Sequence, residues 1–319
     1  MPGKSEGKKI ETIGLIGLGL MGQGISACLI SHGFRVIAYS RTKTRGPQAK
    51  NHIAASLKKL ALKKVLPASV NKGWKNRFHF VHDLEDLAAC KFIIETVSED
   101  FNLKQTIYQA LEKIVSEDTI VATNTSGMPV SLLQEQFAVK KRFLGMHWAE
   151  PAEITRFLEI APGRETDKAV ITTTKEIGER CGKEPTVLNF ELPGLISNRM
   201  MYAMMREALH LVETGVADIE MIDRSFRNDI GWWASICGPF RWMDLTGLPT
   251  YAKVMEGLFP DLSTSTEVPK LMREKAETGS TFYHYPQGKE KAWSEVWTDF
   301  TYDIREITDK YEKKIKLSE

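Results

Sequence analysis

The stretch "ETIGLIGLGLMGQG", residues 11–24, decides the fold of this chain. Residues 10–17 are mostly apolar and end at a glycine, which is typical of a buried strand that leads into a tight turn. The pattern from Met21 to Ser31 is helical, and "FRVIAYS", residues 34–40, predicts a second strand. A strand, a glycine turn, a helix and a strand in this order indicate one unit of a parallel sheet.

The turn places its glycines in the spacing G-x-G-x-x-G. The first glycine of this pattern makes the tight turn, the second lets a pyrophosphate approach the backbone, and the third lets the helix pack against the strand. The motif here follows a strand and opens a helix, which is the context that a dinucleotide site requires. A purely structural glycine turn is the alternative. The residues expected to contact the dinucleotide are Gly17, Gly19, Leu20, Met21 and Gly22.

The end of the second strand indicates which dinucleotide is bound. A chain that binds NAD usually has Asp or Glu about 20 residues after the glycines, bonded to the ribose 2′-OH. Here "YSRTKTR", residues 39–45, contains no carboxylate. Ser40 and Arg41 instead offer a hydroxyl and a guanidinium that could bind a 2′-phosphate. The sequence therefore predicts NAD(P), with NADP favoured over NAD, and a solvated basic loop is the alternative.

Strands and helices continue to alternate to about residue 190, which predicts a Rossmann-type doubly wound sheet domain over residues 1–191. After Pro193 and Gly194 the pattern changes, because strand-like runs almost vanish. Residues 199–215 form a long helical pattern with an apolar stripe. The fold class is thus α/β, with a mainly α-helical C-terminal domain over residues 192–319.

The bulk composition narrows the class of protein. The chain of 319 residues is 42% hydrophobic and 26% charged, as expected of a globular protein. A net charge of +2 indicates no nucleic-acid partner, and no apolar run is long enough for a signal peptide or a membrane span. The first nine residues are polar. Four cysteines far apart predict free thiols in a reducing compartment, so a cytoplasmic location is expected. They are Cys28, Cys90, Cys181 and Cys237.

Four polar residues stand at the edges of apolar segments: Ser126, His147, Glu159 and Asn198. Histidine is a natural group to take a hydroxyl proton. A carboxylate bonded to its other nitrogen would hold the ring and stabilise the imidazolium. Serine and asparagine could hydrogen-bond the substrate oxygen as it becomes a carbonyl. Each residue taken alone could be structural, with Ser126 or Asn198 serving as a helix cap.

These motifs, taken in order, resemble the L-3-hydroxyacyl-CoA dehydrogenase family over roughly residues 10–286. The resemblance includes the glycine motif, "ETVSEDFNLK", "NTS", "GMHW" with a later "LE", "PGLISNR", "GPFRWMDLTGL" and "FYHY". It implies His147 as the catalytic base, Glu159 as its partner, and Ser126 and Asn198 as residues that contact the substrate. It also implies a helical second domain that forms a homodimer. The remaining expected cofactor-binding residues are Glu99, Lys104 and Asn124.

The chain departs from the family beside the histidine, where Glu150 replaces a neutral amide. If Glu150 faces the pocket it disfavours an anionic substrate, and the alternative is that it turns to solvent. "IGWWASICGPFRW" resembles the branch that includes gulonate and carnitine dehydrogenases. Trp232 and Trp233 are candidates for shaping a small pocket, and burial in the core is the alternative. Arg156 is a candidate for binding a substrate carboxylate, and an ion pair with one of the neighbouring acids is the alternative. A basic helical run still permits a CoA phosphate site, through Lys58, Lys59, Lys63 and Lys64.

The sequence therefore predicts an NAD(P)-dependent oxidoreductase that converts a 3-hydroxy acid or a 3-hydroxyacyl thioester to the 3-keto compound, or the reverse. Its partner is a small-molecule substrate, and no metal is expected because His79 and His82 have no partner at metal spacing. Two alternatives remain open. One is an enzyme like the β-hydroxyacid dehydrogenases and imine reductases, and the other is a catalytically silent dinucleotide-binding protein with a structural or sensor role.

Overall fold

The computed structural model describes residues 10–286 and 289–316. The chain divides into two compact units. The first contains the described residues up to Leu195 together with Thr301–Asp303, and the second contains Ile196–Phe300 and the described residues from Ile304 onward. The polar residues 1–9 lie outside the described part of the chain.

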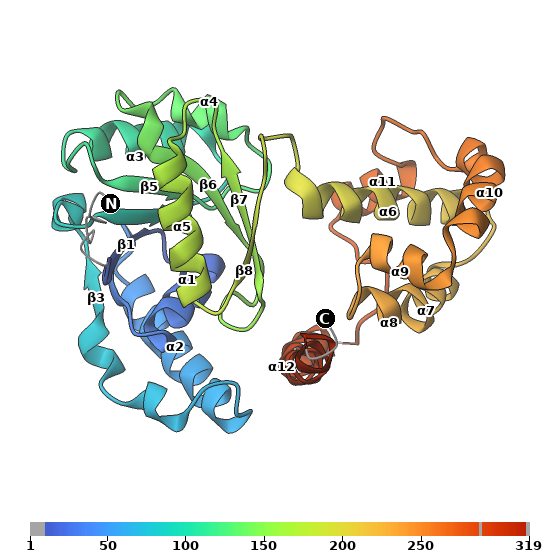
Figure 1. The fold of residues 1–319 in the computed structure, drawn as a ribbon, viewed down its shortest axis with the longest axis horizontal. Helices are drawn as coiled ribbons and strands as arrows, with labels where there is room; N and C mark the ends of the chain where they lie inside the picture. Colours follow the sequence, from blue (N-terminus) through green and yellow to red (C-terminus); the bar gives the residue numbers. More distant parts are fainter. Residues whose placement is uncertain (1–9, 287–288, 317–319) are drawn as a thin grey trace, which may run out of the picture. The chain divides into compact units, whose positions relative to one another are not determined.

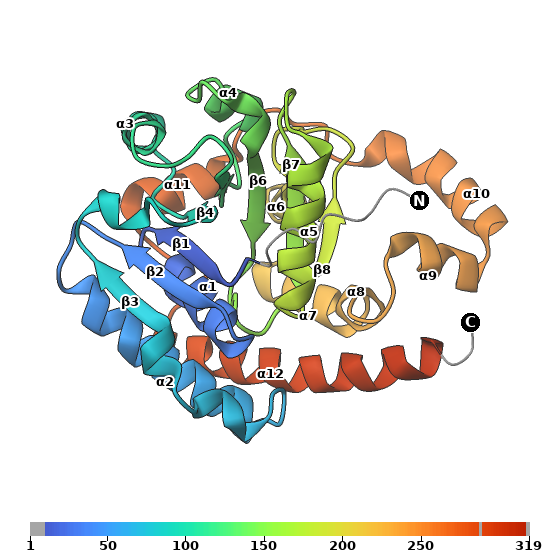
Figure 2. The same ribbon diagram turned by 60° about the vertical axis from the view of Figure 1, so that its left-hand side comes forward.

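The first unit is built on one eight-stranded sheet with the order β3-β2-β1-β4-β5-β6-β7-β8 (Figure 1). Neighbouring strands from β3 to β6 run parallel, β7 runs antiparallel to β6, and β8 runs parallel to β7 (Figure 2). This is the Rossmann-type doubly wound sheet that the glycine turn predicts. The strands are β1 (Thr12–Ile16), β2 (Arg35–Tyr39), β3 (Phe78–Val81), β4 (Phe92–Glu95), β5 (Ile120–Thr123), β6 (Phe143–Trp148), β7 (Phe157–Pro162) and β8 (Glu184–Val187).

Helices cover both faces of this sheet, and each face has its own core. Alternate strand residues point to opposite faces, so Ile94 packs into one core and Ile93 into the other. The first core includes residues of α1, α2 and α5, and the second includes residues of α3 and α4. The helices are α1 (Leu20–Ser31), α2 (Arg45–Leu62), α3 (Phe101–Glu112), α4 (Val130–Gln134) and α5 (Lys168–Arg180), with 3₁₀ turns at Ala68–Asn71, Trp74–Arg77, Leu84–Leu87 and Lys140–Arg142.

The last strand, β8, has no counterpart in the sequence prediction. Its four residues, "EPTV", are exposed or only partly buried, because they form the edge of the sheet. An edge strand of this kind does not show the apolar run or the strict alternation that identifies a strand in sequence.

The second unit is helical over its described residues, as the change of pattern after Gly194 predicts. Many large apolar side chains of this unit are exposed, including Phe240 at 79%, Trp232 at 74% and Leu245 at 71%. No described helix is long and apolar enough to cross a membrane. The helices are α6 (Leu195–Glu213), α7 (Ile219–Asn228), α8 (Ile230–Ala234), α9 (Pro239–Thr246), α10 (Leu248–Leu258), α11 (Lys270–Thr278) and α12 (Lys289–Lys316), with a 3₁₀ turn at Phe259–Asp261.

Candidate active site

The candidate site lies where the strands β1 to β6 end, because all of them run parallel and their carboxyl ends meet at one edge of the sheet. The strand order reverses between β1 and β4, since β2 lies on one side of β1 and β4 on the other. Ligands of open α/β sheets bind at such a switch point, outside the carboxyl ends of the strands. Gly17 follows β1 at this point, and His147 lies near the end of β6.

The glycine turn has the geometry of a dinucleotide cradle. Gly17 has φ +96°, a conformation that residues with a Cβ rarely adopt. A Cβ on Gly22 would lie 2.1 Å from the Gly17 carbonyl oxygen, so the close approach of α1 to β1 requires glycine there. A Cβ on Gly19 would meet no protein atom within 4 Å. Packing of the protein therefore does not require glycine at position 19. A glycine there leaves space for a pyrophosphate to approach the backbone at the N-terminus of α1.

The loop after β2 carries the residues that are expected to bind the ribose 2′-phosphate of the cofactor. Ser40 accepts a hydrogen bond from the Thr42 N–H at 3.2 Å, and its own backbone oxygen lies 3.3 Å from Nδ1 of His82. Arg41 is exposed. The loop thus presents a hydroxyl and a guanidinium, and no carboxylate, at the end of β2.

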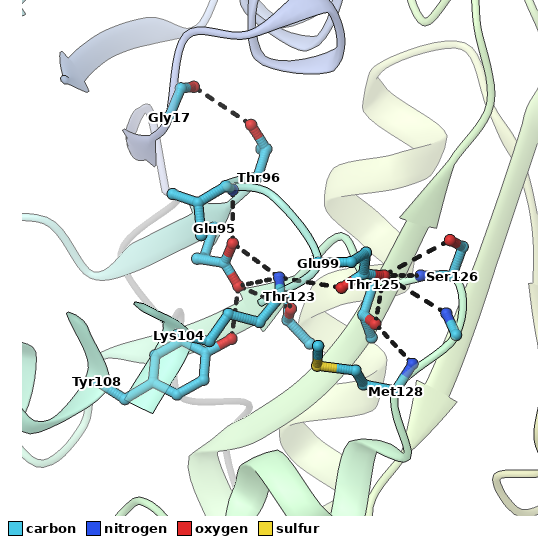
Figure 3. A network of polar contacts seen from close by, with 12 residues as sticks. Gly17, Glu95, Thr96, Glu99, Lys104, Tyr108, Thr123, Thr125, Ser126 and Met128 are labelled. Atoms are coloured by element: carbon cyan, nitrogen blue, oxygen red, sulfur yellow. Dashed lines mark hydrogen bonds and ion pairs between the residues drawn. The ribbon is translucent and has the colours of Figure 1, made fainter. Parts of the chain in front are cut away.

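Glu99 lies in the segment between β4 and α3 and holds the segment after β5. Its Oε1 accepts hydrogen bonds from the Thr125 hydroxyl at 2.7 Å and from the Ser126 N–H at 2.7 Å (Figure 3). Burial opposes ionisation of Glu99, but these hydrogen bonds and the Lys104 ammonium outweigh it and lower the pKa of the carboxyl. Glu99 is therefore an anion that orders the "NTSG" segment at the carboxyl edge of the sheet.

Next to Glu99 lies a fully buried polar network, of which the sequence identified only Lys104 as a candidate site residue. Lys104 donates to both carboxylate oxygens of Glu95, at 2.9 and 2.8 Å, and both side chains are 0% exposed (Figure 3). Thr123 donates to Glu95 at 2.9 Å, and the Tyr108 hydroxyl donates to it as well. Burial and the charge of Glu95 raise the pKa of Tyr108 well above its usual value. The Lys104 ammonium lies 3.6 Å from Glu99, so this network supports Glu99 from below.

His147 and Glu159 form a pair across the antiparallel strands β6 and β7. They are register partners, and Nδ1 of His147 lies 3.1 Å from Oε2 of Glu159. The side chains are 12% and 3% exposed. The Phe157 ring meets the imidazole edge-on at 5.4 Å between ring centroids. The carboxylate is thus placed to hold one ring nitrogen, which leaves Nε2 as the nitrogen that can exchange a proton with a substrate.

The connection between these two strands carries Glu150 and Glu153. Glu150 is exposed, whereas Glu153 is buried and accepts a hydrogen bond from Ser56 of α2 at 2.8 Å. Nε2 of His52, also on α2, lies 3.7 Å from the Glu153 carboxylate. Burial, followed by the charge of Glu153, raises the pKa of Glu150, although His52 acts in the opposite direction. Two carboxylates therefore lie just beyond β6, on the side that α2 contacts.

Lys183 was not predicted as a site residue, and it holds the connection between β6 and β7 in place. It is 5% exposed, and its ammonium donates to the backbone oxygens of Ala152 and Thr155. It also lies over the Trp148 ring, 4.9 Å from the centroid. "CGKEP" looks like a solvated loop in sequence, so no local signal could have identified this lysine. Glu95 left a weak signal, since it ends a buried strand and Lys104 follows nine residues later.

The other predicted site residues lie in several places. The side chain of Asn124 accepts a hydrogen bond from the Trp148 N–H at 2.8 Å, which joins the ends of β5 and β6. Arg156 forms an ion pair with Glu184 of β8 at 2.7 Å. Asn198, in α6, and Trp232, in α8, belong to the second unit. Among residues 10–286 and 289–316, no group of three or more His, Cys, Asp or Glu side chains could hold a metal.

Two family models match the chain. The "3-hydroxyacyl-CoA dehydrogenase, NAD binding domain" matches residues 12–190, and the "3-hydroxyacyl-CoA dehydrogenase, C-terminal domain" matches residues 194–288. A 5-formyl-3-hydroxy-2-methylpyridine 4-carboxylate 5-dehydrogenase of Mesorhizobium japonicum is 32% identical over 83% of this chain and 85% of its own length.

Solved structures agree with these matches. A crystal structure of a 5-formyl-3-hydroxy-2-methylpyridine 4-carboxylic acid 5-dehydrogenase, described as an NAD⁺-dependent dismutase, superposes with a TM-score of 0.89 and 30% identity. It covers 94% of this chain and 99% of its own. The (S)-3-hydroxybutyryl-CoA dehydrogenase PaaH1 of Ralstonia eutropha superposes with a TM-score of 0.72 and 27% identity, over 87% of this chain and 100% of its own.

Proposed function

The chain belongs to the 3-hydroxyacyl-CoA dehydrogenase family, and we propose that His147 moves the proton in its reaction. The protein is an NAD-dependent oxidoreductase that acts on the CH–OH group of a 3-hydroxy acid or a 3-hydroxyacyl thioester and yields the 3-keto compound. The alternative that it is an enzyme like the β-hydroxyacid dehydrogenases and imine reductases is therefore set aside.

The observation that carries the proposal is the contact between Nδ1 of His147 and Glu159 at 3.1 Å. Glu159 holds the ring and stabilises its charged form, so that Nε2 can accept the substrate hydroxyl proton. Bound NAD supplies the hydride acceptor for the carbinol carbon. In the reducing direction the protonated His147 donates its proton to the substrate carbonyl oxygen, which becomes the hydroxyl.

Ser126 and Asn198 bind the substrate oxygen in this proposal. The Ser126 N–H donates to Glu99, which supports a fixed position for the Ser126 hydroxyl at the carboxyl edge of the sheet. A donor that is already oriented stabilises the developing carbonyl without a cost of reorganisation. Asn198 has the same role from the second unit, on the basis of its place in the motif "PGLISNR".

The cofactor is held by the glycine turn, with Leu20 and Met21 at the start of α1 and with Glu99, Lys104 and Asn124 at the neighbouring strand ends. Lys104 acts through Glu99, since its ammonium is enclosed by Glu95 and Thr123. The family binds NAD, and for this chain we propose that NADP is also accepted and is preferred. Chains selective for NAD usually have an acidic residue at the end of β2 that would repel a 2′-phosphate, whereas this chain has Ser40 and Arg41 there. The related pyridine carboxylate dehydrogenase is described as NAD⁺-dependent, so this preference needs a direct test.

The second unit forms a homodimer in this proposal. This unit exposes many large apolar side chains, among them Phe240, Leu245 and Trp232, and a second copy would cover part of this apolar surface. Sedimentation of the full chain and of Phe240→Asp, which is expected to shift the dimer toward monomer, tests this. The location is cytoplasmic, and the free thiols of Cys28, Cys90 and Cys181 suit a reducing compartment.

The test of the proposed function replaces His147 with Gln. The value of kcat is expected to fall by about 10²–10⁴-fold, because general acid–base catalysis is lost, while binding of NAD is retained. His79→Gln is the matched control, since His79 is exposed and bonds only to a local backbone oxygen. A loss below about tenfold in His147→Gln would remove His147 from the catalytic role.

A further inference from the structure

We propose that the substrate of this enzyme carries no CoA group, because Tyr302 and Asp303 of the same chain cover part of the basic face of α2 and contact two of its four lysines. The inference rests on the proposed function and chooses between its two substrate classes. The substrate is then a 3-hydroxy acid without CoA, or another small molecule with the same reacting group. It is not a 3-hydroxyacyl thioester of CoA.

Recognition of CoA requires accessible cations, because CoA carries phosphate groups far from its reacting end. In the first unit the basic run with the most lysines lies on and after α2, with Lys58, Lys59, Lys63 and Lys64. In the run Lys140–Arg142, Lys140 pairs with Glu135 and Glu165 and Arg142 pairs with Glu112, whereas Lys141 is exposed. We take the larger group, the α2 lysines, as the place for a CoA phosphate in this unit.

Two of these four lysines are engaged by the middle of α12, Thr301–Asp303, which belongs to the first unit. Nζ of Lys63 lies 2.6 Å from Oδ1 of Asp303. Nζ of Lys59 lies 4.8 Å from the centroid of the Tyr302 ring. Only Lys58 and Lys64 remain exposed.

Tyr302 is an integral part of this surface. Its side chain is 1% exposed and joins the same buried cluster as Leu57 and Leu60 of α2. An aromatic ring buried to this extent is packed tightly against α2, so a phosphate would have to displace hydrophobic surface that is already in contact. The cover lies outside the family model, which ends at residue 288, whereas α12 begins at Lys289.

The same face of α2, nearer the start of the helix, also disfavours an anion, because His52, Ser56 and Lys59 follow one another at helical spacing. The buried carboxylate of Glu153 contacts Ser56 and lies close to His52. Glu150, in the same connection after β6, adds a second carboxylate near the end of the strand that carries His147. An anionic cofactor that ran from α2 toward His147 would pass these charges, which repel it.

Calorimetry tests the proposal independently of activity. Desulfo-CoA is titrated into the full-length protein in the presence of NAD. We expect no saturable heat up to about 1 mM, and binding with a Kd below about 100 μM would overturn the proposal. A kinetic arm compares 3-hydroxybutyryl-CoA with the N-acetylcysteamine thioester of the same acid, which has the same reacting group. We expect similar kcat/KM values, and a preference of about tenfold or more for the CoA ester would also overturn it.

Two variants test the cover itself. Tyr302→Ala combined with Asp303→Ala releases Lys59 and Lys63, so desulfo-CoA is expected to bind this variant measurably and less tightly at high salt. The matched control is Asp118→Ala, which releases Lys91 from a surface pair at 2.9 Å. If the double variant binds desulfo-CoA no better than the control, the proposal is wrong. Should the double variant unfold, Asp303→Asn carries the same expectation. The proposed function fails separately, if His147→Gln keeps the activity of the parent enzyme, while the calorimetry still decides the question of CoA.

Discussion

Nδ1 of His147 lies 3.1 Å from Oε2 of Glu159, and the two residues face each other directly in the antiparallel register of β6 and β7. Directly opposite residues of an antiparallel pair have Cβ atoms about 5 Å apart, so the longer Glu side chain reaches the ring without distortion. Strand pairing thus brings together two residues that lie twelve positions apart in the sequence.

This contact predicts the behaviour of Glu159→Gln. The amide cannot balance an imidazolium charge, so kcat is expected to fall by about 10²-fold or more while the KM for NAD changes little. Glu165→Gln, at an exposed carboxylate, is the control. Equal kcat values for Glu159→Gln and the parent enzyme would show that Glu159 has no part in the proton transfer.

The predicted preference for NADP over NAD depends on Arg41. Arg41→Ala is expected to weaken NADP binding by roughly tenfold or more, because a charge-assisted pair with the 2′-phosphate is lost, and to leave NAD binding nearly unchanged. Fluorescence titration with both reduced cofactors measures this. Lys72→Ala, another exposed basic residue of the first unit, is the control. Equal losses for the two cofactors, or no loss, would contradict the preference for NADP.

The buried pair of Glu95 and Lys104 predicts a large effect on stability. Glu95→Gln leaves the Lys104 ammonium without its carboxylate in a site where both side chains are 0% exposed. The free energy of unfolding in urea is expected to fall by about 3–5 kcal/mol. Adding Lys104→Met should recover part of this loss, because the unpaired buried charge is removed. If Glu95→Gln is as stable as the parent, the network has no role in holding the site.

Glu99 predicts a pH dependence of stability. Its folded-state pKa is lowered, so its contribution is fully present above the unfolded-state value, about 4.3, and is lost as the pH falls through the folded-state value. Glu99→Gln lacks this contribution. The difference in Tm between the parent and the variant is therefore expected to be larger at pH 7 than below about pH 4. A difference that stays constant across this range would contradict the lowered pKa.

Much of the candidate site could be predicted from the sequence, because its residues follow strands that are themselves recognisable. Gly17 and His147 stand near the ends of apolar runs, and parallel strands bring such ends to one edge. Glu95 and Lys183 could not be assigned in this way. A buried carboxylate at a strand end and a lysine in a short loop have no distinctive local pattern, and only their partners identify them.

The doubly wound sheet, the glycine turn and the helical character of the second unit could be predicted from the sequence, since hydrophobic periodicity and glycine spacing are local properties of the chain. Which charged side chains contact each other depends on tertiary packing. Lys63 and Asp303 are separated by 240 residues and Ser56 and Glu153 by 97, yet both pairs are in contact. Packing of distant segments creates these contacts, and they determine which face of α2 remains open to a ligand.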